Sequence, residues 1–194
     1  MKETVFDFFQ DKNIKTILDF GCGRYLKDSV FYNEQGYDMY CVDLSEQLMK
    51  ISDDGSFNKY FSDGVKFIGN VIPTSKVPVF DAAFINFVLD VTETREKRER
   101  IVKGVSSHVK EGGYITLSVI SEKGVMRLKT KEKYDDDFGY VFEKKAGEFT
   151  FLKGYNKNSF ENIINAGGLE IVLNNKNKPI LYDKGPVLYA ICQK

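Results

Sequence analysis

The chain has 194 residues, of which 42% are hydrophobic and 29% are charged. This is ordinary usage for one globular domain and excludes an intrinsically disordered chain. Its 28 Lys and Arg residues balance 28 Asp and Glu residues, so overall charge gives no general attraction to nucleic acid or anionic lipid. A local basic patch stays compatible with this balance.

The three cysteines, Cys22, Cys41 and Cys192, form no recognisable pattern. An odd number without Cys-x-x-Cys spacing, together with a single histidine, argues against a zinc site and against a disulfide framework. We therefore expect no metal and a reducing compartment, the cytoplasm. Residues 1–12 mix charged and apolar side chains, unlike a cleavable signal, and the most apolar stretch, 82–89, is too short to cross a bilayer.

Continuous apolar runs alternate with helix-like segments along residues 16–120. Runs that are apolar on both faces are typical of parallel strands covered by helices. The alternation therefore predicts an α/β sandwich with a mainly parallel sheet. Strands are predicted at Thr16–Phe20, Met39–Asp43, Val65–Ile68, Ala82–Leu89 and Tyr114–Ile120, and helices at Leu26–Gln35, Glu46–Ile51 and about Val91–Val109.

The last predicted helix of that region starts with a cap-like pair, Asp90 and Glu93. Further along, a short helix opens at Asn158 and precedes two strand candidates, 170–173 and 187–192. The segment between these strands contains two prolines, a glycine and three asparagines, so a crossover helix cannot form there. The last two strands are therefore predicted to pair antiparallel.

Residues 121–155 do not fit the simple alternation. The segment begins basic, turns acidic at 135–137, and then has the pattern of a hairpin with strands at 139–143 and 148–152. It follows the end of a central strand, where ligands bind in open α/β sheets. We expect one domain, 1–194, in which 121–155 is an insertion that acts as a lid or shapes the substrate site.

The most informative residues are Asp19, Gly21 and Gly23, at the end of the first predicted strand. Glycines at this place let the backbone pass close to a ligand. The next strand ends at Asp43, twenty residues after Gly23, where a carboxylate can accept hydrogen bonds from both ribose hydroxyls. Together these features indicate an adenosine-containing cofactor. Leu26 stands where a dinucleotide fingerprint needs its third glycine, which disfavours a nicotinamide dinucleotide.

The sequence resembles the class I S-adenosylmethionine-dependent methyltransferases. The matching residues are Leu-Asp-Phe-Gly-Cys-Gly at 18–23, Val42-Asp43, Phe-Asp-Ala-Ala at 80–83 and Lys-Glu-Gly-Gly-Tyr at 110–114. The antiparallel end of the sheet is also a feature of that family. The resemblance implies a Rossmann-like sandwich, with helices on both faces of a mainly parallel seven-stranded sheet whose last strand is antiparallel. Tyr25 departs from the family pattern, which often has a third glycine there.

The resemblance implies a site for S-adenosylmethionine. Asp19 would help to hold the methionine ammonium, through water or loop amides. Gly21 and Gly23 would let the methionine moiety lie against the backbone, and Asp43 would bind the ribose diol. Asp43 equally suits the cap of the helix that begins near Ser45.

Four further residues belong to this expected cofactor site. Asn70 would contact the adenine amine, although a turn residue is an equal alternative. Asn86, at the end of the fourth strand, would face the sulfonium with its carbonyl or side chain. Cys22 lies between the two glycines and Leu44 follows Asp43, and Cys22 also suits a small buried filler.

Methyl transfer from a sulfonium needs chiefly alignment and exclusion of water, and a general base only where the acceptor must lose a proton. The sequence identifies no catalytic residue. His108 is expected far from the cofactor. Asp90, Glu93, Tyr134 and Tyr140 are the remaining candidates for a base.

These observations predict a methyltransferase that uses S-adenosylmethionine and acts on an unidentified acceptor. A small molecule is favoured because no separate nucleic-acid-binding domain is evident, and no membrane partner is expected. The first alternative is a catalytically silent S-adenosylmethionine- or nucleoside-binding module that acts through protein partners. A nucleic-acid methyltransferase is less favoured, since residues 86–89 lack the Asn-Pro-Pro-Tyr signature. A dinucleotide oxidoreductase is also less favoured. The oligomeric state stays open.

Overall fold

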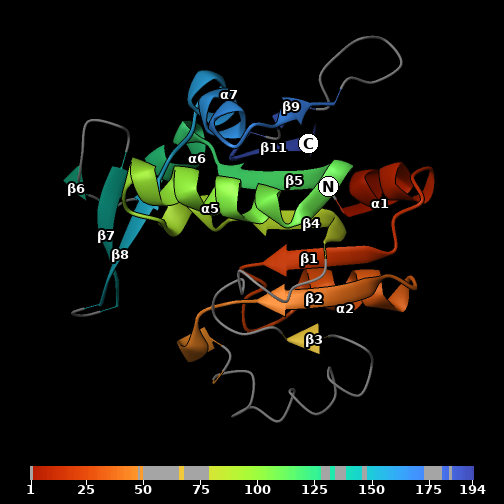
Figure 1. The fold of residues 1–194 in the computed structure, drawn as a ribbon. Helices are drawn as coiled ribbons and strands as arrows, with labels where there is room; N and C mark the ends of the chain where they lie inside the picture. The colour runs from red at the N-terminus through yellow and green to blue at the C-terminus, as the bar shows by residue number, and fades with distance from the viewer. Residues whose placement is uncertain are drawn as a thin grey trace.

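One central sheet organises the protein in the computed structural model, which describes residues 2–47, 49, 66–67, 79–127, 132–133, 139–145, 148–172, 181–183 and 185–194. Within these residues the sheet has eight strands in the order β10-β11-β5-β4-β1-β2-β3, and β9 also pairs with β11 (Figure 1). The strands are β1 Thr16–Phe20, β2 Asp38–Val42, β3 Lys66–Phe67, β4 Phe80–Asn86, β5 Val109–Ile120, β9 Glu170–Ile171, β10 Leu181–Asp183 and β11 Val187–Gln193.

The predicted mainly parallel sheet is confirmed. Strand β1 pairs in parallel with β2 and β4, β2 with β3, and β4 with β5. The predicted antiparallel pairing near the C-terminus is also confirmed, because β11 runs antiparallel to both β9 and β5. The predicted number of seven strands is wrong, since β10 adds an eighth beside β11. This edge strand has only three residues, too few to show as a strand pattern between two prolines.

Helices cover both faces of the sheet (Figure 1). They are α1 Lys2–Gln10, α2 Lys27–Glu34, α5 Arg95–Ser107, α6 Glu122–Met126 and α7 Lys157–Ala166, with a 3₁₀ turn, η1, at Leu89–Val91. Helix α1 was not predicted, because the mixed composition of residues 1–12 gave no clear helical pattern. Of the helix predicted at Glu46–Ile51, residues 46, 47 and 49 are helical and the others lie outside the described residues.

Two predicted helix starts are wrong. Helix α5 begins after Thr94, whose hydroxyl accepts from the Lys97 N–H at 3.3 Å, whereas Asp90 lies earlier, in η1. Helix α7 is capped by Asn156 in a reciprocal pair with Ser159, two residues before the expected Asn158. In both cases a suitable side chain stood near the true start, and only the backbone path selects between neighbours.

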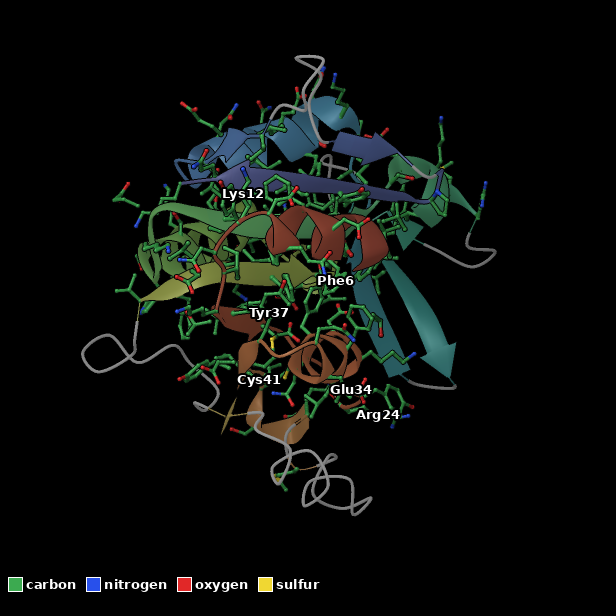
Figure 2. The ribbon with its side chains drawn as sticks, turned by 90° about the vertical axis from the view of Figure 1, so that its right-hand side faces the viewer. Phe6, Lys12, Arg24, Glu34, Tyr37 and Cys41 are labelled. Carbon is green, nitrogen blue, oxygen red and sulfur yellow. The ribbon has the colours of Figure 1, made fainter. Side chains whose placement is uncertain are left out.

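The buried side chains form two hydrophobic clusters, because successive strand residues point to opposite faces of the sheet. One cluster joins alternate residues of β1 and β4 to α5 and α7. The other joins the intervening strand residues to α1 and α2. On this second face aromatic rings fill the space between α1 and β2: Phe6 and Tyr37 lie with ring centroids 6.4 Å apart (Figure 2).

The segment after β5 forms α6 and then a separate three-stranded antiparallel sheet, β6 Glu132–Lys133, β7 Gly139–Lys145 and β8 Glu148–Lys153. The predicted hairpin at 139–152 is thereby confirmed. Figure 1 shows this small sheet at the end of the central sheet toward which β1 and β2 point, and β8 contacts η1. Among the described residues no helix is long and apolar enough to span a membrane.

Candidate functional site

A cavity of about 410 Å³ opens where β1, β2 and β4 end. Its lining comes from the β1–α2 loop, from the end of β2 and from the chain that follows β4. These segments contribute, among others, Gly21, Gly23, Asp43, Leu44 and Phe87. Four of the eight predicted cofactor residues therefore line one cavity. Its volume lies in the range of about 300–1,000 Å³ that small-molecule sites have.

The β1–α2 loop needs glycine at both positions that the sequence singled out. Gly21 and Gly23 have φ of 77° and 65°, which side-chain-bearing residues adopt only with strain. At Gly21 the position of a Cβ is already filled by Cγ2 of Val88. The Gly21 N–H donates to the Val42 carbonyl at 2.7 Å, which fixes the loop to β2. The bare backbone of this loop therefore borders the cavity directly.

Asp43 joins the two loops at the cavity. Its Oδ2 accepts from the Gly23 N–H at 2.6 Å and its Oδ1 from the Leu44 N–H at 2.7 Å. A carboxylate has about four acceptor sites on its two oxygens, so each oxygen keeps capacity for a further donor. Asp43 thus holds the glycine loop in place and also offers hydrogen-bond acceptors on the wall of the cavity.

Asp19, in β1, and Cys22, in the glycine loop, are not among the residues that line the cavity. Asp19 is 3% exposed and accepts from the Ser29 hydroxyl of α2 at 2.5 Å. The Ser29 hydroxyl also lies 3.0 Å from the Cys41 sulfur. A hydrogen bond with Cys41, together with burial, raises the pKa of the Cys22 thiol. This cluster supports the loop, and a contact of Asp19 with a ligand stays a prediction.

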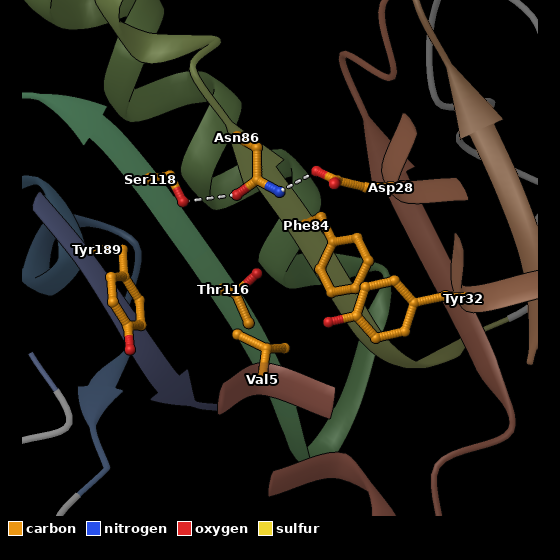
Figure 3. A pocket seen from close by; sticks show the side chains of 8 residues that line it. All are labelled: Val5, Asp28, Tyr32, Phe84, Asn86, Thr116, Ser118 and Tyr189. Atoms are coloured by element: carbon orange, nitrogen blue, oxygen red, sulfur yellow. Dashed lines mark hydrogen bonds between the residues drawn. The ribbon is translucent and has the colours of Figure 1, made fainter. Parts of the chain in front are cut away.

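Asn86 belongs to a different, much smaller cavity of about 10 Å³ (Figure 3). Its Nδ2 donates to Asp28 Oδ2 at 2.9 Å, and its Oδ1 accepts from the Ser118 hydroxyl at 2.8 Å. Figure 3 shows Asn86 bridging α2 and β5, with Val5 of α1 beside Thr116. The side chain is therefore not brought together with Gly21 and Asp43. The predicted adenine contact, Asn70, lies outside the described residues.

No protein-family model and no curated protein matches the sequence. Solved structures, in contrast, do match the chain. The chain is similar to an S-adenosylmethionine-dependent methyltransferase from Clostridium acetobutylicum at 17% identity, with a TM-score of 0.69 over 99% of this chain and 89% of that one. A second similar structure is a methyltransferase from Methanosarcina mazei, at 16% identity with a TM-score of 0.70 over 98% of this chain and 96% of that one. A third is the 1,6-didemethyltoxoflavin-N1-methyltransferase from Burkholderia thailandensis, at 17% identity with a TM-score of 0.63 over 100% of this chain and 76% of that one.

The chain has the Rossmann-like fold of the class I S-adenosylmethionine-dependent methyltransferases. In this methyltransferase fold the sheet ends in antiparallel strands, as β11 does here. The cavity lies at the carboxyl ends of the parallel strands, which is where ligands bind in open α/β sheets. The cavity and the glycine loop therefore lie together at the edge of the sheet where this fold is expected to bind a ligand.

The wall of the cavity that follows β4 was missed by sequence reasoning. Phe87 has a φ of 59°, in the left-handed region, although it is not glycine. Its N–H donates to the Ser118 carbonyl at 2.9 Å, and its side chain is 41% exposed. Val88 and Val91 continue this wall. The predicted strand 82–89 included Phe87 and Val88, whereas β4 ends at Asn86, and nothing in the sequence indicates a positive φ at a phenylalanine.

His108 and the candidate bases from the sequence belong to several different parts of this methyltransferase fold. His108 is at the other end of β4, where its carbonyl accepts from the Phe80 N–H at 2.8 Å. Glu93 pairs with Lys97 at 3.3 Å. Tyr140 donates to the Met126 sulfur at 3.7 Å, and Tyr134 lies outside the described residues. None of the described candidates lines the cavity.

Asp90 is the most unusual of these groups. It is 1% exposed, and its Oδ1 accepts from the Ile120 N–H at 2.9 Å. Its Oδ2 has no hydrogen-bond partner among the residues that the structure describes. Burial raises the pKa of this carboxyl to about 7, and the hydrogen bond from Ile120 only partly opposes that shift. Asp90 ties η1 to the end of β5, and in the chain it stands between Val88 and Val91, which line the cavity.

Proposed function

We propose that this protein transfers a methyl group from S-adenosylmethionine to a small-molecule acceptor. The observation that carries the proposal is the joint placement of Gly21, Gly23 and Asp43 on one cavity at the carboxyl ends of the parallel strands. The bare loop backbone lets a ligand approach closely. Asp43 presents acceptor capacity to a pair of hydroxyls, as a ribose would need.

The residues present fit this cofactor in chemical terms. The cofactor would supply the activated methyl group on its sulfonium. Gly21 and Gly23 would border its methionine part, Asp43 would accept from its ribose hydroxyls, and Leu44 and Val42 would offer apolar contact beside Asp43. Asp19, through Ser29, would keep the loop in its binding shape.

For the chemical step the protein's main task would be alignment and exclusion of water. Residues 121–155, whose strand β8 contacts η1 beside the cavity, would act as a lid or shape the acceptor site within a single domain, 1–194. A small-molecule acceptor is supported by the neighbouring toxoflavin-type N1-methyltransferase, which was solved with bound 1,6-didemethyltoxoflavin.

A second candidate is a binding module without catalysis. It is favoured by one observation: among the described residues that line the cavity, Asp43 has the only acidic or basic side chain. An acceptor that must lose a proton would then find no separate base. Acceptors whose nucleophile is already deprotonated need none.

Calorimetry and label transfer test both candidates. The cofactor and its product S-adenosylhomocysteine are expected to bind at one site per chain, whereas NAD is expected not to bind. Transfer of labelled methyl groups from the cofactor to a small-molecule extract would establish the enzyme. Cofactor binding without any transfer, across extracts and pH, favours the silent module. Binding of NAD in preference to both sulfur nucleosides contradicts the proposal.

A further inference from the structure

The second inference concerns the acceptor and rests on the proposed function. We propose that Phe87 is the acceptor-contacting residue of this site, and that the acceptor presents a flat, largely apolar face, as an aromatic or heteroaromatic small molecule does. The juxtaposition that carries it is Phe87 with Val91 on the wall of the cavity that contains Gly21 and Asp43.

The backbone at Phe87 is the first observation. Left-handed backbone is unfavourable for a residue with a bulky side chain, because the Cβ crowds the carbonyl oxygen. Burial does not offset that cost here, since the side chain is 41% exposed. Glycine or asparagine would adopt a φ of 59° more easily. A strained residue beside a ligand cavity points to a role for its side chain there.

The second observation is the distribution of exposed apolar side chains. Leu44, Phe87 and Val91 are 64%, 41% and 52% exposed. All three line the same cavity, although they come from the end of β2 and from two places after β4. The other strongly exposed large apolar side chains that the structure describes, such as Val79 and Met126, are not among its lining. Exposed apolar groups gathered at one opening indicate contact with an apolar ligand.

The chemistry of the wall decides which ligand this is. The adenine ring of the cofactor has an apolar contact in Leu44 beside Asp43, whereas its charged and hydroxyl groups match the loop backbone and Asp43. The side chains of Phe87, Val88 and Val91 offer such groups no hydrogen bond, and the Thr92 hydroxyl, which already donates to the Val88 carbonyl at 2.8 Å, can only accept. A polyol held there would leave hydroxyls without hydrogen-bond partners. A planar ring instead buries apolar area and meets Phe87 in offset or edge-to-face contact.

Ligand-observed NMR and calorimetry on the full chain saturated with S-adenosylhomocysteine test this inference. The planar probes are quinoline and 1-naphthol, and the polyol probe is myo-inositol. The planar probes are expected to bind with dissociation constants in the millimolar range, at least about tenfold more tightly than myo-inositol. Phe87→Asn, which tolerates the left-handed backbone, is expected to weaken planar binding about tenfold, and Phe87→Tyr to stay within about twofold of the wild type.

Met126→Asn removes a comparably exposed apolar side chain outside the cavity and is the matched control, with planar binding expected unchanged. Equal binding of planar and polyol probes, or unchanged planar binding in Phe87→Asn, overturns the inference. Equal loss of S-adenosylhomocysteine and planar probes in Phe87→Asn, with an unchanged melting temperature, also overturns it, because Phe87 would then serve the cofactor. Failure of S-adenosylhomocysteine to bind the wild type instead overturns the proposed function.

Discussion

Asp43 accepts a hydrogen bond from the backbone N–H of Gly23 at 2.6 Å. The two residues lie at the ends of adjacent parallel strands, β1 and β2, so one carboxylate sets the distance between two loops that border the cavity. The bond also gives Asp43 a structural role besides the ribose contact that we propose. The effects of replacing Asp43 on loop structure and on ligand binding must therefore be measured separately.

Asp43→Ala is expected to weaken binding of S-adenosylhomocysteine by about 1–3 kcal/mol, because charge-assisted hydrogen bonds to hydroxyls are lost. Calorimetry measures this change, and thermal unfolding reports the part that comes from loosening the loop. Asp38→Ala, at the opposite end of β2, is the control and should bind like the wild type. Unchanged affinity in Asp43→Ala would remove Asp43 from the ligand site.

Gly21→Ala is expected to lower the free energy of unfolding by about 2–4 kcal/mol, from left-handed strain and overpacking together. The strain comes from a φ of 77°, and the overpacking comes from Val88. Gly36→Ala is a matched control, because its φ is 90° and no atom lies within 4 Å of the added Cβ. It should cost only the backbone part, about 1–2 kcal/mol. Chemical denaturation measures the free energy of unfolding of both variants. An equal decrease in the two would show that the Val88 side chain can move aside without loss of stability.

The positions of Gly21 and Asp43 could be predicted because both follow from local rules. A strand that ends in glycines and a second strand that ends in a carboxylate place those groups at one edge of a parallel sheet. The same reasoning gave the antiparallel end of the sheet, since prolines and asparagines excluded a crossover helix. These inferences use chain direction and turn chemistry, which short stretches of sequence contain.

The wall after β4 and the surroundings of Asn86 could not be predicted in this way. Which side of a strand end faces a cavity depends on how the following turn leaves the sheet, and the turn at Phe87 has a φ that its side chain disfavours. The partners of Asn86 come from residues 28 and 118, so only tertiary packing brings them together. The burial of Asp90 was missed for the same reason, because a cap and a buried acid look alike in sequence.

Asn86→Ala is expected to lower the free energy of unfolding by about 1–3 kcal/mol, since it removes the hydrogen bonds that join the amide to Asp28 and to the Ser118 hydroxyl. Because the side chain lines the small cavity and not the larger one, affinity for S-adenosylhomocysteine should stay within about twofold of the wild type. Calorimetry at a temperature where both proteins are folded checks this. A loss of affinity without a loss of stability would return Asn86 to the cofactor site that the sequence suggested.

Asp90 gives the protein a pH-dependent stability whose sign is fixed by burial. The pKa of its carboxyl is raised from an ordinary 3.8 to about 7 in the folded chain. Between these values the folded chain keeps a proton that the unfolded chain releases. The free energy of unfolding should therefore fall as pH rises from about 4 to about 7, by at most about 4 kcal/mol, and level off above that.

Asp90→Asn removes this titration and keeps an acceptor for the Ile120 N–H. Chemical denaturation between pH 4.5 and about 8 should thus give a flatter profile for the variant than for the wild type. Asp11→Asn, on an exposed residue, should keep the wild-type slope. Only the slopes of stability against pH are compared between the proteins. The new amide N–H groups of Asp90→Asn themselves lower the free energy of unfolding, because Oδ2 had no hydrogen-bond partner among the described residues. Parallel profiles for Asp90→Asn and the wild type would mean that the buried carboxyl is ionised throughout, held by a donor that compensates its burial.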